Sequence, residues 1–206
     1  LEGTSRSFYP TLKYLPKKIR GQIGLLYLLA RVADTIADSK HGETEELLRL
    51  LNGYNDVAQG RSNELPDLSH IADIQENENE AELLRNVQDV IEGLDVYSEG
   101  DRERMLECLD TIVGGQILDL ERFGPANEGE TISALVDNAE MDDYTFRVAG
   151  CVGVFWTKMT LAHMFTMSRE KEEEFFMKGI RFGKALQMIN ILRDIPEDLR
   201  FGRCYI

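Results

Sequence analysis

The stretch Gln22-Ile-Gly-Leu-Leu-Tyr-Leu-Leu-Ala-Arg-Val-Ala-Asp-Thr-Ile-Ala-Asp38 decides the fold class of this chain. Apolar residues fill most of its positions and leave little polar face, which predicts a largely buried helix over residues 22–38. Arg31, Asp34 and Asp38 interrupt the apolar surface. Burying such groups destabilises a fold unless they are paired or bound to a ligand. They are therefore the first candidates for a functional site.

The acidic spacing of Asp34-Thr-Ile-Ala-Asp38 recurs near the other end of the chain, in Asp194-Ile-Pro-Glu-Asp198. Four residues along a helix is a rotation of about 400° and a rise of roughly 6 Å, so each pair of carboxylates shares one helical face. Like charges at that separation repel, and a hard divalent cation held by oxygens relieves the repulsion. Mg²⁺ favours one or two carboxylates together with substrate phosphates. The spacing alone is also typical of solvated helix faces.

Helical periodicity dominates the rest of the chain, and strand alternation is scarce. We expect an all-α, single-domain bundle over residues 1–206, with about six or seven helices around one cavity. The expected helices cover residues 22–38, 43–58, 81–98, 101–122, 130–167 (one helix, or two with a bend near Met141-Asp142-Asp143) and 171–193.

Three interruptions of the helical pattern carry further expectations. Residues 60–79 read as a polar loop. The tandem Gly114-Gly115 either kinks its helix or lets another backbone approach. Pro196 is expected to end or distort the last helix inside the second acidic pair.

The net charge of −14 and the isoelectric point near 4.7 argue against nucleic-acid binding, which requires a basic face. The charge is uneven, because residues 43–130 hold 23 acidic and 6 basic side chains, whereas residues 1–20 are basic. The acidic middle is typical of solvated helix surface. The basic ends carry or adjoin the acidic pairs, an arrangement that an anionic ligand bridging both ends would explain.

The three cysteines, Cys108, Cys151 and Cys204, have neither disulfide-framework nor zinc spacing, which predicts a reducing, cytoplasmic setting. No apolar run approaches a membrane span, and the start lacks the shape of a signal peptide. We expect a cytoplasmic protein that contacts a membrane peripherally. The chain starts without Met and stops soon after the second acidic pair, so we expect further C-terminal helices beyond it.

Four blocks of sequence together resemble the squalene/phytoene synthase family, which joins two prenyl diphosphates head to head. They span nearly the whole chain in the order of the family, and Gly202-Arg-Cys-Tyr205 follows them as in the family. The blocks are Ser5-Arg-Ser-Phe8, Tyr27-Leu-Leu-Ala-Arg-Val-Ala-Asp-Thr-Ile-Ala-Asp38, Tyr144-Thr-Phe-Arg-Val-Ala-Gly-Cys-Val-Gly153 and Gln187-Met-Ile-Asn-Ile-Leu-Arg-Asp-Ile-Pro-Glu-Asp198. The resemblance implies a class I isoprenoid synthase bundle around a central apolar cavity.

The resemblance also implies a role for each matching residue. Asp34, Asp38, Asn190, Asp194 and Asp198 would hold Mg²⁺ ions that grip the diphosphates. Tyr27 and Tyr144 would lie at the head of an apolar tunnel near the reacting carbons. The residues implied to bind substrate are Arg6, Ser7, Phe8, Arg31, Gln187, Asn190, Arg193 and Arg203.

The reaction needs such a set of groups. Ionisation of an allylic diphosphate builds charge on the leaving group, which a metal cluster and arginines stabilise. The allyl cation must be shielded from water, and an apolar tunnel provides that shield. Either the diphosphate or Tyr144 could remove the proton that closes the cyclopropane ring, and the residues do not decide between them.

Within the family, the blocks around Asp34 and Tyr144 look closest to bacterial-type squalene synthases. The leading expectation is condensation of two farnesyl diphosphates to presqualene diphosphate, followed by reduction to squalene with NADPH. The alternatives are a phytoene or dehydrosqualene synthase without the reduction and, in another class, a non-catalytic relative that acts as an assembly or interaction protein. The last would be expected to lack some of the aspartates, and this chain keeps all four.

Overall fold

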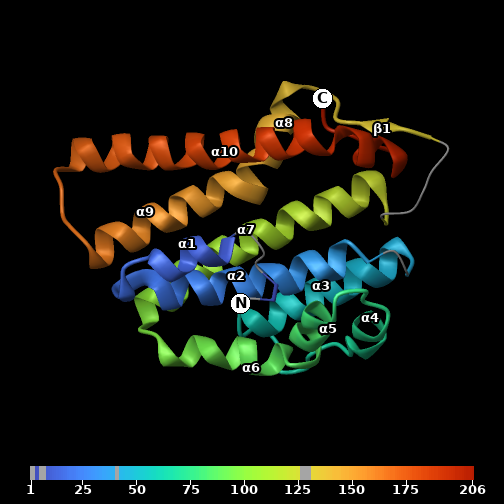
Figure 1. Ribbon diagram of the computed structural model, residues 1–206, viewed down its shortest axis with the longest axis horizontal. Helices are drawn as coiled ribbons and strands as arrows, with labels where there is room; N and C mark the ends of the chain where they lie inside the picture. The colour runs from blue at the N-terminus through green and yellow to red at the C-terminus, as the bar shows by residue number, and fades with distance from the viewer. Residues whose placement is uncertain (1–2, 5–7, 40–41, 126–130) are drawn as a thin grey trace.

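The computed structural model describes residues 3–4, 8–39, 42–125 and 131–206, and the side chain of Phe8 lies outside that description. Figure 1 shows α9 and α10 along one side of the molecule, α1, α2, α3 and α7 through the middle, and α4 to α6 on the opposite side. The described residues are almost entirely helical, as the sequence predicts. None of the described helices combines the length and apolarity needed to cross a membrane.

Helix α2 (Lys17–Ala37) is the central element, and its apolar surface forms the middle of the core. Leu29, Val32, Ala33 and Ile36 have no exposed surface, which matches the uninterrupted apolar pattern of the sequence. Helix α1 (Phe8–Tyr14) precedes α2 and was not among the expected helices. Pro16 stands directly before α2, where a fixed φ and a missing N–H favour the start of a helix.

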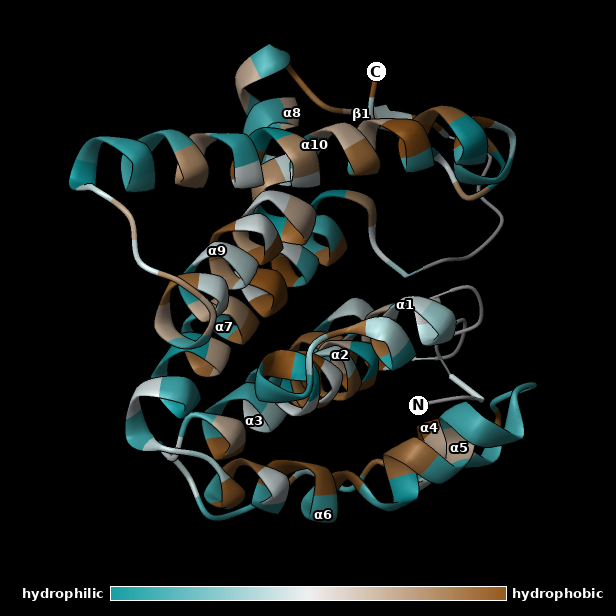
Figure 2. Cartoon of the chain, turned by 60° about the vertical axis from the view of Figure 1, so that its left-hand side comes forward, coloured by the Kyte–Doolittle hydropathy of each residue, from teal (hydrophilic) through white to brown (hydrophobic). Residues whose placement is uncertain are grey.

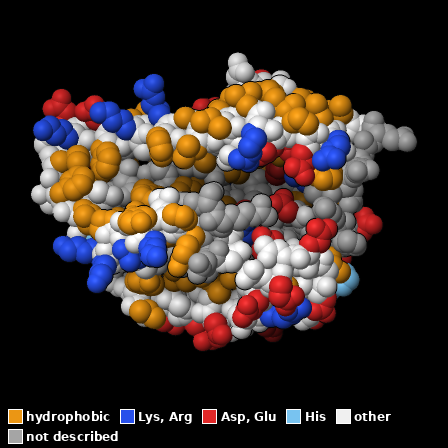
Figure 3. Space-filling model, in the orientation of Figure 1, with side chains coloured by type: hydrophobic (Ala, Val, Ile, Leu, Met, Phe, Trp, Pro, Cys, Tyr) orange, Lys and Arg blue, Asp and Glu red, His pale blue; other side chains and the backbone are white. Residues whose placement is uncertain are grey.

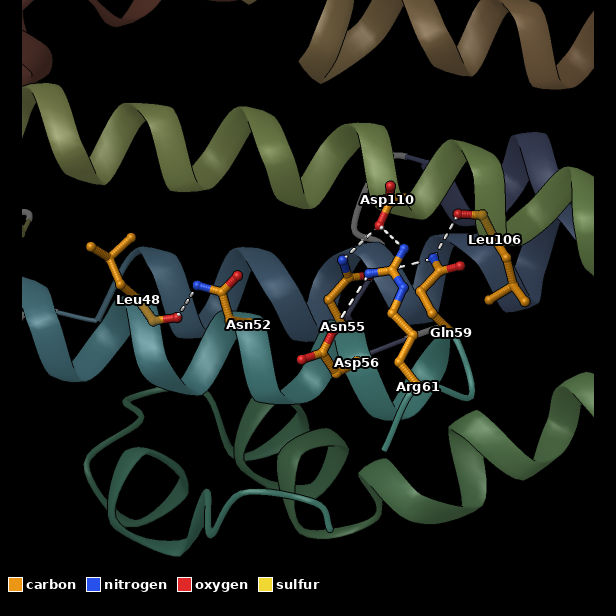
Figure 4. Close-up of polar contacts among 8 residues, drawn as sticks. All are labelled: Leu48, Asn52, Asn55, Asp56, Gln59, Arg61, Leu106 and Asp110. Carbon is orange, nitrogen blue, oxygen red and sulfur yellow. Dashed lines mark hydrogen bonds and ion pairs between the residues drawn. The ribbon is translucent and has the colours of Figure 1, made fainter. Parts of the chain in front are cut away.

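Helices α3 (Thr44–Ala58) and α7 (Glu99–Phe123) pack on α2 and on each other. Their interface carries polar contacts at one end, drawn in Figure 4, where Asp110 accepts hydrogen bonds from Asn55 Nδ2 at 2.8 Å and Arg61 Nη2 at 3.0 Å. Helix α7 runs unbroken through Gly114-Gly115. A Cβ on Gly115 would lie 2.9 Å from Arg147 Cβ, so the tandem glycine allows close approach of another segment.

The other side of α2 is covered by short helices rather than by one loop and one helix. They are α4 (Ser69–Asp73), α5 (Glu78–Arg85), α6 (Val87–Glu92) and the 3₁₀ turn η1 (Gly93–Val96). Part of the predicted loop 60–79 is therefore helical. The predicted helix 81–98 divides at Asn86, whose side chain bonds the Glu82 carbonyl at 2.7 Å in competition with the helical ladder.

The predicted helix 130–167 is three elements: α8 (Asn138–Thr145), the π-helical turn η2 (Phe146–Gly150) and α9 (Cys151–His163). The transition therefore follows the expected bend at residues 141–143 by a few residues. Before α8, strand β1 (Ser133–Ala134) pairs in parallel with strand β2 (Arg203–Cys204). This pairing of distant segments cannot be read from local periodicity.

Helix α10 (Arg169–Arg200) packs on α9 and η2 through glycines. A Cβ on Gly153 would lie 2.0 Å from the Gly179 carbonyl oxygen, and one on Gly183 would lie 2.3 Å from that of Ala149. Gly153 is thus needed for close packing.

The expectation that Pro196 ends α10 is wrong, since the helix continues through it to Arg200. Pro196 lies on the exposed side, so water can satisfy the carbonyl that loses its donor.

Candidate active site

The two acidic pairs, almost 160 positions apart in the sequence, line one cavity of about 450 Å³. Helices α2, α7 and α10, with α8 and the segment after α10, form its wall. Most of the predicted site residues meet there: Arg31, Asp34, Asp38, Tyr144, Gln187, Asn190, Arg193, Asp194, Asp198 and Arg203. The cavity therefore joins residues that the sequence could only suggest were neighbours.

Asp34 lies in the cavity wall, enclosed by protein but with 42% of its side chain accessible from the cavity. Burial and the charge of Asp38 raise its pKa to about 7, although Arg31 and Gln116 act in the opposite direction. Gln116 Nε2 donates to Asp34 Oδ1, and Arg31 Nη1 is 4.0 Å from Asp34 Oδ2. Burial also raises the pKa of Asp38. The positive charge near this pair is therefore not enough to offset the burial of its two carboxylates.

The pair on α10 has a different environment. Arg193 donates from Nε and Nη2 to the two oxygens of Asp194, both at 2.6 Å, and this lowers the pKa of Asp194. Burial, followed by the charge of Asp194, raises the pKa of Asp198. One turn before Asp194, Asn190 Nδ2 donates to Gln187 Oε1 at 3.3 Å.

Four enclosed polar atoms of cavity residues have no hydrogen-bond partner within the described part of the chain. They are Arg31 Nε, Gln116 Oε1, Asp119 Oδ1 and Arg203 Nε. Buried donors and acceptors are normally satisfied, so unpaired ones grouped at a cavity indicate a polar ligand. The arginine nitrogens suit an anion, and the oxygens suit a cation or a hydrogen-bond donor.

A second cavity of about 840 Å³ adjoins the first and has a mainly apolar lining. Val148, Gln187 and Asn190 line both cavities, so the polar and apolar spaces meet at these residues. Its apolar wall includes Val152, Trp156, Phe175, Phe182 and Leu186. Figure 2 shows the hydrophobic segments of α9 and α10 that face this region, and Figure 3 shows the hollow between α10 and the α1–α2 side.

The oxygen ligands of the polar cavity fit the chemistry of Mg²⁺. The raised pKa values of Asp34, Asp38 and Asp198 indicate carboxylates that a cation would stabilise. Among the described residues, no three acidic, His or Cys side chains converge closely enough to hold an ion by themselves.

Of the other four predicted site residues, only Tyr27 has a described side chain, and it is not part of the lining of either cavity. Arg6 and Ser7 lie outside the described residues, and of Phe8 only the backbone is described. Tyr27 lies one turn before Arg31, which contacts its hydroxyl at 3.4 Å, and the Tyr27 hydroxyl donates to the Thr4 carbonyl at 2.9 Å. Its predicted position beside the reacting carbons stays a prediction.

Three cavity residues had no role in the sequence-based prediction: Gln116, Asp119 and Tyr205. Gln116 directly follows Gly114-Gly115 and Asp119 lies about one helical turn later, and that glycine pair was the available signal of a close approach. Tyr205 ends the Gly202-Arg-Cys-Tyr205 motif, of which only Arg203 had been assigned a role. The Asp119 side chain is only 16% exposed.

Comparisons with known proteins agree with this arrangement. The model of the family described as squalene/phytoene synthase matches residues 1–206. The chain is 28% identical to a presqualene diphosphate synthase of Zymomonas mobilis, over 98% of this chain and 56% of that protein. It is 26% identical to a phytoene synthase of Rhodobacter capsulatus, over 98% and 48%, and 25% identical to a squalene synthase of Schizosaccharomyces pombe, over 98% and 42%.

A solved structure of TcSQS in complex with the ligand E5700 superposes with a TM-score of 0.69, at 22% identity. The match covers 94% of this chain and 51% of that one, and it shows the shared fold. The chain spans from 42% to 56% of the length of these three curated relatives. With the family model matching from end to end, the chain belongs to the squalene/phytoene synthase family.

Proposed function

We propose that the protein condenses two farnesyl diphosphates head to head to presqualene diphosphate, with Mg²⁺, and then reduces this product to squalene with NADPH. One observation carries the proposal: a cavity with two acidic pairs and three arginines adjoins a larger apolar cavity and shares three lining residues with it. Such a neighbouring pair of spaces suits a substrate with a diphosphate head and a hydrocarbon tail. The family membership and the names of the relatives support it.

The arginines bind the diphosphate oxygens and stabilise the charge that develops on the leaving group. Arg203 is nearly buried and is held by the Gly124 carbonyl, which accepts from Nη2 at 3.1 Å. Its unpaired Nε and that of Arg31 remain as donors in the cavity wall. A fixed guanidinium in a dry site stabilises developing negative charge without reorganisation at the moment of reaction.

The acidic pairs supply the oxygen ligands for Mg²⁺. Asp34, Asp38, Asn190, Asp194 and Asp198 would hold the ions, which when bound neutralise diphosphate oxygens and so assist ionisation. Arg193 forms hydrogen bonds with both oxygens of the Asp194 carboxylate. It would release that carboxylate and turn to phosphate when the ligand enters.

The apolar cavity excludes water from the allyl cation and leaves the double bond of the second substrate as the available nucleophile. Tyr144 stands in the wall of the polar cavity, which meets the apolar one at Gln187. Burial raises the pKa of Tyr144, and so keeps its hydroxyl protonated before reaction. The proton that leaves on ring closure goes to the diphosphate, either directly or through the Tyr144 hydroxyl, which accepts it while passing its own proton to a diphosphate oxygen.

Phytoene or dehydrosqualene synthesis, without reduction, is the second candidate. Phytoene synthases stand among the relatives at an identity similar to that of the squalene synthase. The metal and diphosphate chemistry would be the same, and only the tail length and the final step would differ.

We also propose that the rim of the apolar cavity contacts a membrane surface, where a hydrocarbon product can leave. Thr11 of α1 lines this cavity, and the exposed Lys13, Lys17 and Lys18 follow it, with Tyr14 85% exposed. Figure 3 shows Lys and Arg side chains beside a hydrophobic area on this face. Basic and aromatic side chains together favour the surface of anionic lipids. Co-sedimentation with anionic but not neutral vesicles, lost on changing the three lysines to glutamate, tests this contact.

The test of the reaction is product analysis with full-length protein, Mg²⁺, and farnesyl or geranylgeranyl diphosphate, each with and without NADPH. We expect squalene from farnesyl diphosphate with NADPH, and presqualene diphosphate without it. Phytoene from geranylgeranyl diphosphate would establish the second candidate instead. Absence of Mg²⁺-dependent turnover in folded protein would favour a non-catalytic relative. The exposed, unpaired Asp89 of α6 provides a matched control, Asp89→Asn, for changes at the acidic pairs.

A further inference from the structure

Two tyrosines, from segments about 60 residues apart, stack in the wall of the polar cavity. The ring centroids of Tyr144 and Tyr205 are 4.5 Å apart, with 22° between the ring planes. Phe123, at the end of α7, meets the Tyr205 ring edge-on at 5.2 Å. Tyr205 is only 6% exposed, so its ring forms a fixed support beneath that of Tyr144.

The hydroxyl of Tyr205 is anchored by Asp119 on α7. It donates to Asp119 Oδ2 at 2.6 Å, a short distance typical of a hydrogen bond to a charged acceptor. Arg203 Nη1 lies 3.8 Å from the same oxygen. A carboxylate held between a phenol and a guanidinium fixes both the position and the rotation of the Tyr205 ring.

The backbone also ties the two tyrosines together. In the β1–β2 ribbon, Ser133 N–H donates to the Gly202 carbonyl at 2.8 Å and Leu135 N–H donates to that of Cys204 at 3.0 Å. Strand β1 leads into α8, which carries Tyr144, and β2 is followed at once by Tyr205. Each tyrosine is thus held relative to the other through main chain as well as through its ring.

The electrostatics of Tyr144 reflect the same neighbours. Burial raises its pKa, the charge of Asp119 raises it further, and hydrogen bonding with Tyr205 and Gln187 lowers it. Tyr205, whose ring stacks on that of Tyr144, and Gln187, in the same cavity wall, are therefore polar neighbours of Tyr144. Gln187 belongs to both cavities, which places this hydroxyl near their junction.

We propose that Asp119 and Tyr205 are positioning residues, which hold the Tyr144 hydroxyl at the junction of the two cavities through a stacked ring and a phenol–carboxylate hydrogen bond. The inference rests on the proposed function, because it gives Tyr144 a place in the reaction. It adds two residues that act through Tyr144 and need no contact with substrate. The alternative is that Asp119 and Tyr205 only stabilise the fold around the end of α10.

The experiment compares Tyr205→Phe, Asp119→Asn, Tyr144→Phe and the double variant Tyr144→Phe/Tyr205→Phe in full-length protein. Tyr205→Phe keeps the ring and removes only the hydroxyl, and Asp119→Asn is the second variant should the first fold poorly. We expect each to lower kcat about ten- to a hundredfold with little change in KM, as a small misplacement of a reacting group does. In the Tyr144→Phe background, removing the Tyr205 hydroxyl should cause no further loss.

Tyr54→Phe is the matched control, since it removes another buried phenol that donates to the Leu29 carbonyl at 2.8 Å, away from both cavities. It should leave kcat unchanged. Equal losses from Tyr205→Phe with and without Tyr144 would overturn the proposal, and so would an effect confined to KM.

A second measurement needs no activity. In protein labelled with ¹³C at the Cζ of tyrosine, the Tyr144 signal should shift in Tyr205→Phe and in Asp119→Asn, and stay in place in Tyr54→Phe. If the wild type makes no prenyl product but the signal shifts, the proposed function fails and the positioning contact stands. If the Tyr144 signal stays unchanged in both variants, the positioning inference is overturned whatever the enzyme makes.

Discussion

The two acidic pairs have the same spacing and the same cavity, yet their surroundings are opposite. On α2, Asp34 is enclosed near the core, lacks enough positive charge, and has its pKa raised to about 7. On α10, Asp194 is already paired with its neighbour Arg193, and its pKa is lowered. Of the 32 residues of α10 only Gly183 and Ile191 are buried, whereas about half of α2 is buried.

On the proposed function, this contrast divides the site into two parts. The α2 carboxylates would bind a cation where they stand, whereas Asp194 on α10 would first have to leave Arg193. The α2 pair sits on a helix held by the core, so its position is fixed and its charge is uncompensated. In the α10 pair, Asp194 has an ion-pair partner to exchange, and the pair lies on a helix with few buried residues. We infer that the α2 pair fixes the position of the proposed metal–diphosphate site. The α10 pair would complete the set of ligands when the diphosphate binds.

The largest effect is expected from Asp34→Asn and Asp194→Asn, each of which removes one negative ligand and keeps the shape of the side chain. Both should lower activity at least about a hundredfold, as loss of one stabilising group at a developing charge does. The comparison predicts opposite changes in stability, with ligand-free Asp34→Asn more stable than wild type and Asp194→Asn less stable. Steady-state assays and thermal melts check this. Equal stability changes in the two variants would remove the contrast.

The next effect concerns the turn that follows Asp198. Gly202 has φ +73°, and a Cβ there would lie 2.6 Å from the Thr131 carbonyl oxygen, so Gly202→Ala opposes the β1–β2 pairing. We expect a loss of about 1–3 kcal/mol in the free energy of unfolding and a clear loss of activity. Gly60→Ala, at φ +71° with open space around it, carries the backbone strain without the clash and should leave activity unchanged. Urea denaturation and turnover measure both.

A smaller effect is the pH dependence of stability without metal or ligand. An unfolded Asp titrates near pH 3.9, and Asp34 in the fold titrates near 7, so the folded state binds its proton more tightly. The stabilising contribution is complete below about pH 4 and is lost as the pH rises towards 7. After allowance for screening from the open cavity, we expect a fall of about 1 kcal/mol between pH 5 and 7.

Urea denaturation in EDTA at pH 5, 6 and 7 measures this slope. Asp34→Asn should reduce it and leave a smaller slope from Asp119, whose pKa burial raises to about 6. Asp194→Asn should leave it in place, because a lowered pKa makes its contribution disappear only as the pH falls below about 4. A slope that Asp34→Asn does not change would show that Asp34 is not the group responsible.

The smallest effect is expected at Pro196. Replacing it by Ala restores one backbone N–H inside α10 on an exposed surface. We expect α10 to stay intact, with stability unchanged or higher by a few tenths of a kcal/mol and activity within about threefold of wild type. Circular dichroism, thermal melts and turnover test it. A large loss of activity would mean that Pro196 is needed to orient Asp198.

The two acidic pairs also show which parts of the structure could be predicted from the sequence. Helix α2 was predictable, since nearly every position of its apolar surface is buried, and the positions of Asp34 and Asp38 followed from it. The location of the α10 pair beside the α2 pair rested on the resemblance. The division of α8, η2 and α9, the continuation through Pro196 and the β1–β2 ribbon depend on contacts between distant segments, which local propensity does not contain.

The same limit applies inside the site. Asp119 and Tyr205 reach the cavity through the ribbon and through α7, so no local pattern marked them, and the pairing of Arg193 with Asp194 depends on side-chain geometry. Tyr27 is not part of either cavity lining, and its role, which rested on the resemblance, stays a prediction.

The most direct test of the central claim is to measure by calorimetry the affinity for inorganic diphosphate in the presence of Mg²⁺. Three proteins are compared, with Asp89→Asn as the control. They are the wild type, Asp34→Asn/Asp38→Asn, and Asp194→Asn/Asp198→Asn. If both pairs grip one ligand, each double variant should lose at least about tenfold in affinity, while the control matches the wild type. Wild-type affinity in either double variant would contradict a shared site for the two pairs.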